Sequence, residues 1–172
     1  MNITVYMAMS IDGKVARTND ETPWSDESWD AFNERINIAD AFIIGRETYE
    51  IMVGEGSLED IKIPIIVLSS KETTRDGVAV FEKLENALNH LEKKSLIDVV
   101  VAGGSIANGS FIKAGLVNDL IIDVEPILLG KGKPLFDVDF DDLSVDDLPN
   151  FELVEFKKLG TSNTLQLTYT KK

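Results

Sequence analysis

Short apolar runs alternate with amphipathic segments along most of the chain. The runs are rich in β-branched and other apolar residues, which predicts buried strands. They cover residues 2–9, 40–45, 63–70, 78–80, 97–103 and 116–125. Between several of these runs apolar residues recur three or four positions apart, which predicts helices. The expected helices are one that begins after Ser25 and three that cover 47–52, 82–93 and 105–114.

Local signals mark the ends of the first elements. Asp12-Gly13 directly follows the first apolar run and predicts a turn. Residues 14–24 show neither the alternation of a strand nor the three-to-four-residue spacing of a helix, and they are expected to form a loop. Ser25 can cap the next helix, because its hydroxyl can accept a hydrogen bond from a backbone N–H of the first turn.

Two alternating segments near the C-terminal end predict a β-hairpin. Residues 151–159 and 164–171 alternate apolar and polar positions, and the turn-forming sequence GTSN joins them at 160–163. The strand-helix alternation before them predicts a mixed, mainly parallel central sheet flanked by helices. No internal repeat, low-complexity tract or linker interrupts the pattern, so residues 1–172 are expected to form one α/β domain.

The chain is strongly acidic, with 30 Asp and Glu against 17 Lys and Arg and a formal net charge of −13. Charge repulsion argues against a nucleic-acid partner and against an anionic membrane surface. No apolar run approaches the ~20 residues that span a bilayer. The N-terminal segment lacks the basic region and cleavage site of a signal peptide, so a cytoplasmic location is expected.

The residue types also argue against a metal centre. The chain has no Cys and one His, which excludes disulfides, thiolate sites and a multi-histidine site. Asp137, Asp139 and Asp141 have the spacing that opens a calcium loop, but Asp142 and Leu148 stand where that loop needs Gly and Glu. We therefore expect no metal and interpret this stretch as a solvated acidic face.

The apolar run at 97–103 ends in two adjacent glycines. Gly103 and Gly104 are followed by Ser105, Ile106 and Ala107, where the next helix should begin. Ligands of open α/β sheets gather at the carboxyl ends of the strands, where a helix N-terminus offers free N–H groups. Glycine allows positive φ and the close approach of a phosphate. Two interpretations stay open, a phosphate-binding loop and a tight turn that only joins strand to helix.

Polar and basic residues follow two further predicted strands. They are Gly45, Arg46 and Thr48 after one strand, and Ser69, Ser70 and Lys71 after the next. A guanidinium presents a planar fork to a phosphate, and hydroxyls beside an ammonium suit a second phosphate. Each segment alone could be a capped loop with a solvated charge. Three such strand ends in one sheet suggest a single ligand with separated phosphates, such as an NADP-type dinucleotide.

These segments resemble the dihydrofolate-reductase-like fold, and more closely the reductase domain of riboflavin biosynthesis with its small single-domain relatives. The resemblance covers 9–16, 41–50, 65–70, 99–136 and the final hairpin. It implies a sheet with NADPH across its carboxyl edge and a small-molecule substrate beside the nicotinamide. Such reductases are often dimers, so the resemblance also implies a homodimer, to which the strand around Glu125 could contribute.

The resemblance assigns a role to each of the strand-end residues. It places Gly45, Arg46 and Thr48 at the phosphates, Ser69, Ser70 and Lys71 around the adenosine 2′-phosphate, Gly103, Gly104, Ser105, Ile106 and Ala107 at the pyrophosphate, and Ala8 with residues 12–16 beside the nicotinamide and the substrate. The cofactor expected from these assignments is NADPH.

Three acids are candidates for the chemistry. Asp12 and Glu125 best match the acids that lie near the substrate in the riboflavin relatives. Asp123 stands two residues before Glu125 on the same predicted strand, so the two share a face. An acid against an apolar pocket keeps a raised pKa and could donate a proton. The alternative is that one or both acids pair with Lys131 or Lys133.

The expected function is an NADPH-dependent reductase of a heterocyclic small molecule. The nearest named activity is 5-amino-6-(5-phosphoribosylamino)uracil reductase. Dihydrofolate or pterin reduction is the alternative enzymatic function. Pro23-Trp24 matches a motif of dihydrofolate reductases. Ser28 or Trp29, however, stands where those enzymes have the acid that pairs with the pteridine, and this argues against folate reduction. The alternative from another class is a non-catalytic NADP-binding or dimerising module.

Overall fold

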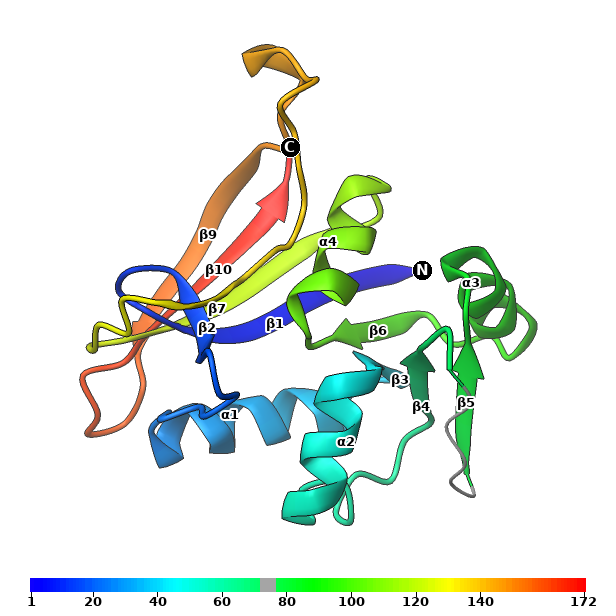
Figure 1. Cartoon of the computed structure of the whole chain (residues 1–172), viewed down its shortest axis with the longest axis horizontal. Helices are drawn as coiled ribbons and strands as arrows, with labels where there is room; N and C mark the ends of the chain where they lie inside the picture. Colours follow the sequence, from blue (N-terminus) through cyan, green and yellow to red (C-terminus); the bar gives the residue numbers. More distant parts are fainter. Residues whose placement is uncertain (72–76) are drawn as a thin grey trace.

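An eight-stranded sheet forms the centre of the protein (Figure 1). The computed structural model describes residues 1–71 and 77–172. In chain order the strands of this sheet are β1 (Asn2–Ser10), β3 (Ala41–Gly45), β4 (Ile65–Leu68), β5 (Val78–Phe81), β6 (Asp98–Val101), β7 (Asp119–Glu125), β9 (Phe151–Lys158) and β10 (Leu165–Lys171). Their order across the sheet is β5-β4-β3-β6-β1-β7-β10-β9.

The sheet is parallel from β5 to β7, whereas β10 runs antiparallel to both β7 and β9. In the parallel register Val5 of β1 stands opposite Val101 of β6 and Leu120 of β7. This arrangement confirms the predicted mixed, mainly parallel sheet with a C-terminal antiparallel hairpin.

Helices cover both faces of the sheet (Figure 1). They are α1 (Asp26–Asn37), α2 (Arg46–Glu55), α3 (Leu84–Lys93) and α4 (Ser105–Lys113). Successive strand residues point to opposite faces. Ile43 of β3 therefore packs in the core layer with α3 and α4, while Phe42 and Ile44 pack in the layer with α1 and α2. Because both faces are buried, the central strands read as continuous apolar runs.

A small second sheet corrects the expected loop at 14–24. β2 (Lys14–Arg17) pairs antiparallel with β8 (Gly132–Pro134). The partner strand lies more than a hundred positions along the chain, and neither strand is long enough to show a period of its own. The local sequence therefore could not reveal the pairing.

The acidic segment between β8 and β9 lies on the surface and contains the short 3₁₀ helix η1 (Val145–Asp147). Asp137, Asp139, Asp141 and Asp142 are exposed, as predicted for a solvated face. Within residues 1–71 and 77–172, no three His, Asp or Glu side chains are grouped so that they could hold a metal ion. No helix in these ranges is both long and apolar enough to cross a bilayer.

Helix α4 contacts the backbone of the acidic segment at Gly109. The Asp137 N–H donates a hydrogen bond to the Ser105 carbonyl oxygen at 2.9 Å. A Cβ atom on Gly109 would lie 2.4 Å from the Asp137 carbonyl oxygen. Only glycine allows this approach, so Gly109 fixes the segment against the helix.

We expect Gly109→Ala to lower the free energy of unfolding by about 1–3 kcal/mol, because the new methyl group overlaps backbone that cannot move freely. The matched control is Gly54→Ala in α2, where a Cβ meets nothing within 4 Å. This variant should gain about 0.5–1 kcal/mol from the higher helix propensity of alanine. Urea denaturation of both variants measures the difference, and equal losses would contradict the close packing at Gly109.

Candidate functional site

The carboxyl ends of four parallel strands surround a cavity of about 680 Å³. Its wall includes residues at or just after the ends of β1, β3, β4 and β6, among them Ala8, Gly45, Ser69 and Ala102. The strand ends converge because parallel neighbours all finish at the same edge of the sheet. We call this space the main cavity.

Two helices begin at the main cavity. Helix α2 starts at Arg46 and α4 at Ser105, with Gly45 and Gly104 as their N-cap residues. Neither glycine has a side chain that could cap its helix. The first N–H groups of both helices thus lack side-chain partners, and the positive ends of two helix dipoles meet at one wall. This arrangement suits an anionic ligand.

The paired glycines bring the loops after β3 and β6 together. The Gly45 N–H donates to the Gly103 carbonyl oxygen at 2.7 Å, and a Cβ on Gly45 would lie 3.3 Å from the Gly104 nitrogen. Gly103 has a φ of +91°, which favours glycine, and the Gly103–Gly104 peptide bond is cis. The Gly103 N–H donates to Oδ1 of buried Asn108 at 2.9 Å. Asn108 therefore fixes this bend, a role that the sequence analysis missed although an Asn inside an apolar helix is a signal.

Most of the predicted cofactor residues line the main cavity. They are Ala8, Gly45, Arg46, Thr48, Ser69, Ser70, Gly104, Ser105, Ile106 and Ala107. Gly103 and Lys71 are not among its lining residues. The Ser69 hydroxyl accepts a hydrogen bond from the Lys71 N–H at 3.0 Å and donates to the Lys71 carbonyl oxygen at 2.7 Å. This turn places the exposed Lys71 beyond the cavity wall.

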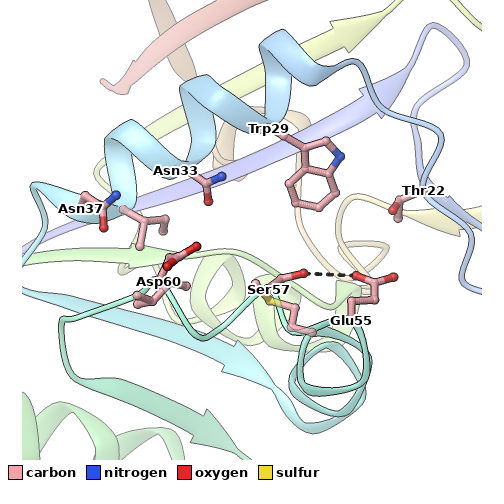
Figure 2. A pocket seen from close by; sticks show the side chains of 10 residues that line it. Thr22, Trp29, Asn33, Asn37, Glu55, Ser57 and Asp60 are labelled. Carbon is pink, nitrogen blue, oxygen red and sulfur yellow. Dashed lines mark hydrogen bonds between the residues drawn. The ribbon is translucent and has the colours of Figure 1, made fainter.

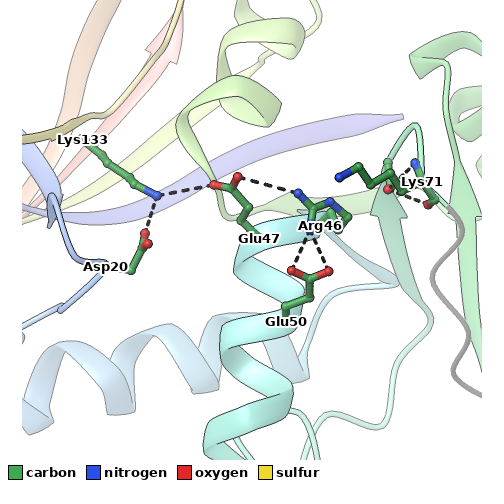
Figure 3. A network of polar contacts seen from close by, with 7 residues as sticks. Asp20, Arg46, Glu47, Glu50, Lys71 and Lys133 are labelled. Atoms are coloured by element: carbon green, nitrogen blue, oxygen red, sulfur yellow. Dashed lines mark hydrogen bonds and ion pairs between the residues drawn. The ribbon is translucent and has the colours of Figure 1, made fainter.

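A chain of charges lies along the cavity wall (Figure 3). Lys133 forms ion pairs with Asp20 and, at 3.5 Å, with Glu47. The hydrogen bond to Asp20 is the main reason why the pKa of Lys133 is raised. Arg46 contacts Glu47 at 3.8 Å and binds Glu50 at 2.7 Å. The two basic residues of this wall are thus both engaged by carboxylates, and Lys133 pairs with neither Asp123 nor Glu125.

Asp123 lies in a buried polar cluster behind the cavity wall. Its carboxylate accepts hydrogen bonds from the Tyr6 hydroxyl at 2.9 Å, the Ser28 hydroxyl at 2.8 Å and Gln166 Nε2 at 2.8 Å. Burial raises the pKa of Asp123, although the three hydrogen bonds act to lower it. Tyr6 and Ser28 line the main cavity and Asp123 does not. The Asp123 carboxyl group is thus separated from the main cavity only by the side chains of Ser28 and Tyr6, whose hydroxyls it contacts.

The sequence analysis missed the partners of Asp123, but two of them had a signal. Ser28 stands at an offset where the family resemblance leads one to expect an acid. Tyr6 precedes Ala8 by two positions on β1 and so shares its face. Gln166 faces Asp123 across the β7–β10 ladder, a register that local sequence does not reveal.

Hydrogen bonds from two other segments of the chain hold the Glu125 carboxylate in place. Its carboxylate accepts hydrogen bonds from the Ser25 N–H at 2.9 Å, the Ser25 hydroxyl at 2.7 Å and the Thr164 hydroxyl at 2.7 Å. It is buried and does not line the main cavity. Glu125 is only 3% exposed, so its side chain offers little surface to a second copy of the chain. Glu125 therefore lies outside the lining of the main cavity in this structure, and its position beside the substrate stays a prediction.

Asp12 is also absent from the cavity wall. Its carboxylate accepts hydrogen bonds from the Ser10 hydroxyl at 2.6 Å, the Leu129 N–H at 3.0 Å and the Gly130 N–H at 2.7 Å. These bonds, that of Ser10 first, lower the pKa of Asp12 to about 2. The Asp12 carboxylate thus holds the turn before β8, and its lowered pKa does not favour proton donation. Its position beside the substrate stays a prediction. Of the segment 12–16, Val15 and Ala16 do line the cavity.

A second cavity of about 630 Å³ opens between α1 and the end of α2 (Figure 2). Its lining residues are Thr22, Trp29, Asn33, Ile36, Asn37, Met52, Glu55, Ser57, Asp60 and Ile61. Thr22, Trp29, Met52 and Glu55 also line the main cavity, so the two spaces adjoin each other. We call this second space the polar groove.

Dihydrofolate reductases and a riboflavin biosynthesis protein are among the proteins that this chain resembles. Dihydrofolate reductase type 15 from Escherichia coli is 29% identical over 126 residues, which are 73% of this chain and 78% of that protein. The crystal structure of a putative riboflavin biosynthesis protein from Shewanella sp. PV-4 matches with a TM-score of 0.81 and 24% identity, over 100% of this chain and 99% of the other. Dihydrofolate reductase from Enterococcus faecalis, complexed with NADP(H) and RAB-propyl, matches with a TM-score of 0.74 and 20% identity, over 99% and 96%.

The family model described as the RibD C-terminal domain matches residues 1–165, nearly the whole chain. The match includes all the strand ends that form the main cavity, from Ala8 to Ala107. The solved structures agree with it in fold over the full length of the chain. The chain therefore belongs to the RibD C-terminal domain family.

Proposed function

We propose that the protein is an NADPH-dependent reductase of a heterocyclic small molecule of the pyrimidine or pterin type. The observation that carries the proposal is the convergence of the loops after β3, β4 and β6, with two uncapped helix N-termini, on one cavity. The nearest named activity is 5-amino-6-(5-phosphoribosylamino)uracil reductase. The family match and the fold shared with reductases support a reductase of a pyrimidine or a pterin.

The donor set of the main cavity fits a dinucleotide. The N-terminus of α4, from Gly104 to Ala107, would hold the pyrophosphate through backbone N–H groups. Ser69 and Ser70 would face the adenosine 2′-phosphate, with Arg46 turned from Glu50 towards it and Lys71 beyond them. Ala8 has a side chain small enough to leave room for a flat ring at the end of β1. When bound, NADPH supplies the hydride, and the residues of the chain orient it against the substrate.

Reduction of a C=N or C=O bond also requires a proton, and Asp123 is the proposed source. In its protonated form the Asp123 carboxyl can pass a proton to the Ser28 hydroxyl, which releases its own proton to the substrate nitrogen or oxygen. Tyr6 and Gln166 hold the carboxyl in place through their hydrogen bonds. Ser28 is then the group that touches the substrate, and Asp123 acts through it.

Reduction of a pterin ring is the second candidate function. Dihydrofolate reductases are relatives in both sequence and fold. The Ser28–Asp123 pair supports it as well, because a carboxyl group reached through a hydroxyl could still exchange a proton with a pteridine.

Arg46→Ala should weaken NADPH binding about tenfold and NADH binding much less, because a guanidinium bonded to the 2′-phosphate contributes about 1.5–3 kcal/mol and NADH lacks that group. Glu50→Gln is the matched control, since it removes the carboxylate that now holds Arg46. It should leave NADPH binding unchanged or tighter. Fluorescence titration of both cofactors measures the effect, and equal losses for NADPH and NADH in Arg46→Ala would contradict the assignment.

Asp123→Asn should lower kcat by about 10²–10⁴-fold, which is the typical contribution of general acid catalysis. The wild-type rate should fall as pH rises, because deprotonation of Asp123 removes the proton source, and the variant should lose this dependence. Ser28→Ala should show the same lower rate, whereas Ser28→Thr, which keeps the hydroxyl, should retain part of it. An unchanged pH profile in Asp123→Asn would argue against the proton route.

Stability gives an independent check of the Asp123 environment. In the unfolded chain Asp123 has the ordinary pKa of 3.8 and loses its proton above that pH. Because the pKa is raised in the folded protein, the folded state keeps this proton to a higher pH. The contribution of this proton is therefore fully present below pH 3.8 and is lost as pH rises through the folded pKa. Asp123→Asn should gain stability relative to wild type between acidic and neutral pH, and exposed Asp142→Asn should not. Parallel stability curves for wild type and Asp123→Asn would contradict the raised pKa.

The homodimer remains a prediction, and the outer strand β9 supports it. Leu153 and Phe156 pair with Tyr169 and Leu167, which lie two positions apart on β10, so Leu153 and Phe156 share a face. They are 46% and 67% exposed. If a second copy covers them, Phe156→Glu should dissociate the assembly, because it would bury an unpaired carboxylate. Sedimentation at several concentrations is the measurement, with exposed Glu152→Gln as the control. A monomer for the wild type over the whole range would refute the homodimer.

A further inference from the structure

We propose that the polar groove holds the side chain of the substrate and selects one that is uncharged or cationic over one that carries phosphate or carboxylate. The inference rests on the proposed reductase function and narrows it to a class of heterocycles. It departs from the named phosphoribosyl substrate, because it predicts that the phosphate weakens recognition at this site.

The groove is placed to receive part of a substrate that enters the main cavity. Trp29 and Thr22 line both spaces from one side, and Met52 and Glu55 line both from α2. A heterocycle beside Ala8 and Ser28 would therefore direct its substituent past Trp29 into the groove. The combined space holds more than a flat ring.

One wall of the groove is a stripe along α1. Trp29, Asn33 and Asn37 are four positions apart, so they lie on the same face of the helix. Figure 2 shows these three side chains facing the end of α2 and the turn after it. Among the residues that the structure describes, the side-chain amides of Asn33 and Asn37 make no hydrogen bond, so both can serve a polar ligand.

The opposite wall carries negative charge. Glu55 and Asp60 line it, and Ser57 donates a weak hydrogen bond to Glu55 at 3.5 Å. Within the described part of the chain, the Asp60 carboxylate takes part in no ion pair. None of the described lining residues is Lys, Arg or His. An anionic substituent would meet two carboxylates and no cation, whereas a hydroxyl would find acceptors and amides and an ammonium would find opposite charge.

The basic residues of the main cavity do not change this balance. Lys133 is held by Asp20 and Glu47, and Arg46 is held by Glu50. Neither Arg46 nor Lys133 lines the groove. The net charge of −13 acts in the same direction. The groove is thus built for hydrogen bonding without anion recognition.

The test uses matched substrates that differ only in side-chain charge. One pair is an aminouracil riboside with and without its 5′-phosphate, and one series is dihydropterins whose side chain ends in amine, hydroxyl or carboxylate. Oxidation of NADPH gives kcat/KM, and calorimetry with the NADPH-loaded protein gives affinity. The uncharged or cationic member should be favoured about threefold to tenfold at low salt, and less at about 1 M salt, where charges are screened within about 3 Å.

Asp60→Lys should reverse this preference, and Asp60→Asn should reduce it. The control is Asp30→Asn, an exposed acid on α1 that lines neither cavity, and it should leave the preference as in the wild type. Preference of the wild type for the phosphate or carboxylate member, or the same ratio in Asp60→Lys as in wild type, would overturn the inference. If none of the heterocycles oxidises NADPH, the proposed reductase function is refuted. The affinities from calorimetry, compared between charged and uncharged members, would still test the groove.

Discussion

The hydrogen bond from the Gly45 N–H to the Gly103 carbonyl oxygen is the contact on which the site depends. It joins the ends of β3 and β6 so closely that a Cβ atom on Gly45 would lie 3.3 Å from the Gly104 nitrogen. Because α2 and α4 begin directly after these loops, the same contact sets the position of both helix N-termini. A bulky residue at Gly45 would separate the loops and move two clusters of free N–H groups away from each other.

Two buried acids of β7, Asp123 and Glu125, hold further elements of the fold in place. Asp123 holds Ser28 of α1 and Gln166 of β10, while Glu125 holds Ser25 at the start of α1 and Thr164 beside β10. Two carboxylates on one face of β7 thus tie a helix to a distant strand. The position of α1 matters because its exposed stripe forms a wall of the polar groove. Polar contacts at the centre of the molecule therefore shape a space at its surface.

The fold was largely predictable because its central strands are buried on both faces and appear as apolar runs such as 40–45 and 97–103. The edge where polar strand ends meet was predictable for a topological reason, since parallel strands finish together. The hydrogen-bond partners of the individual acids were not predictable. Asp12 and Glu125 match a family pattern in sequence, but their carboxylates are taken up by Ser10 and Ser25, which only the three-dimensional arrangement reveals. The β2–β8 pairing escaped prediction for the same reason, because its partners are distant in sequence.

The chain of charges from Asp20 through Lys133 to Glu47 has a kinetic consequence. It links the small β2–β8 sheet to the first turn of α2 across the wall of the main cavity. Lys133 and Glu47 are partly exposed, so their pair contributes only about 0–1 kcal/mol and opens readily. A bound molecule lying against this link would stay longer when the link is closed. Its residence time would then shorten as ionic strength rises, even where the equilibrium shape of the cavity is unchanged.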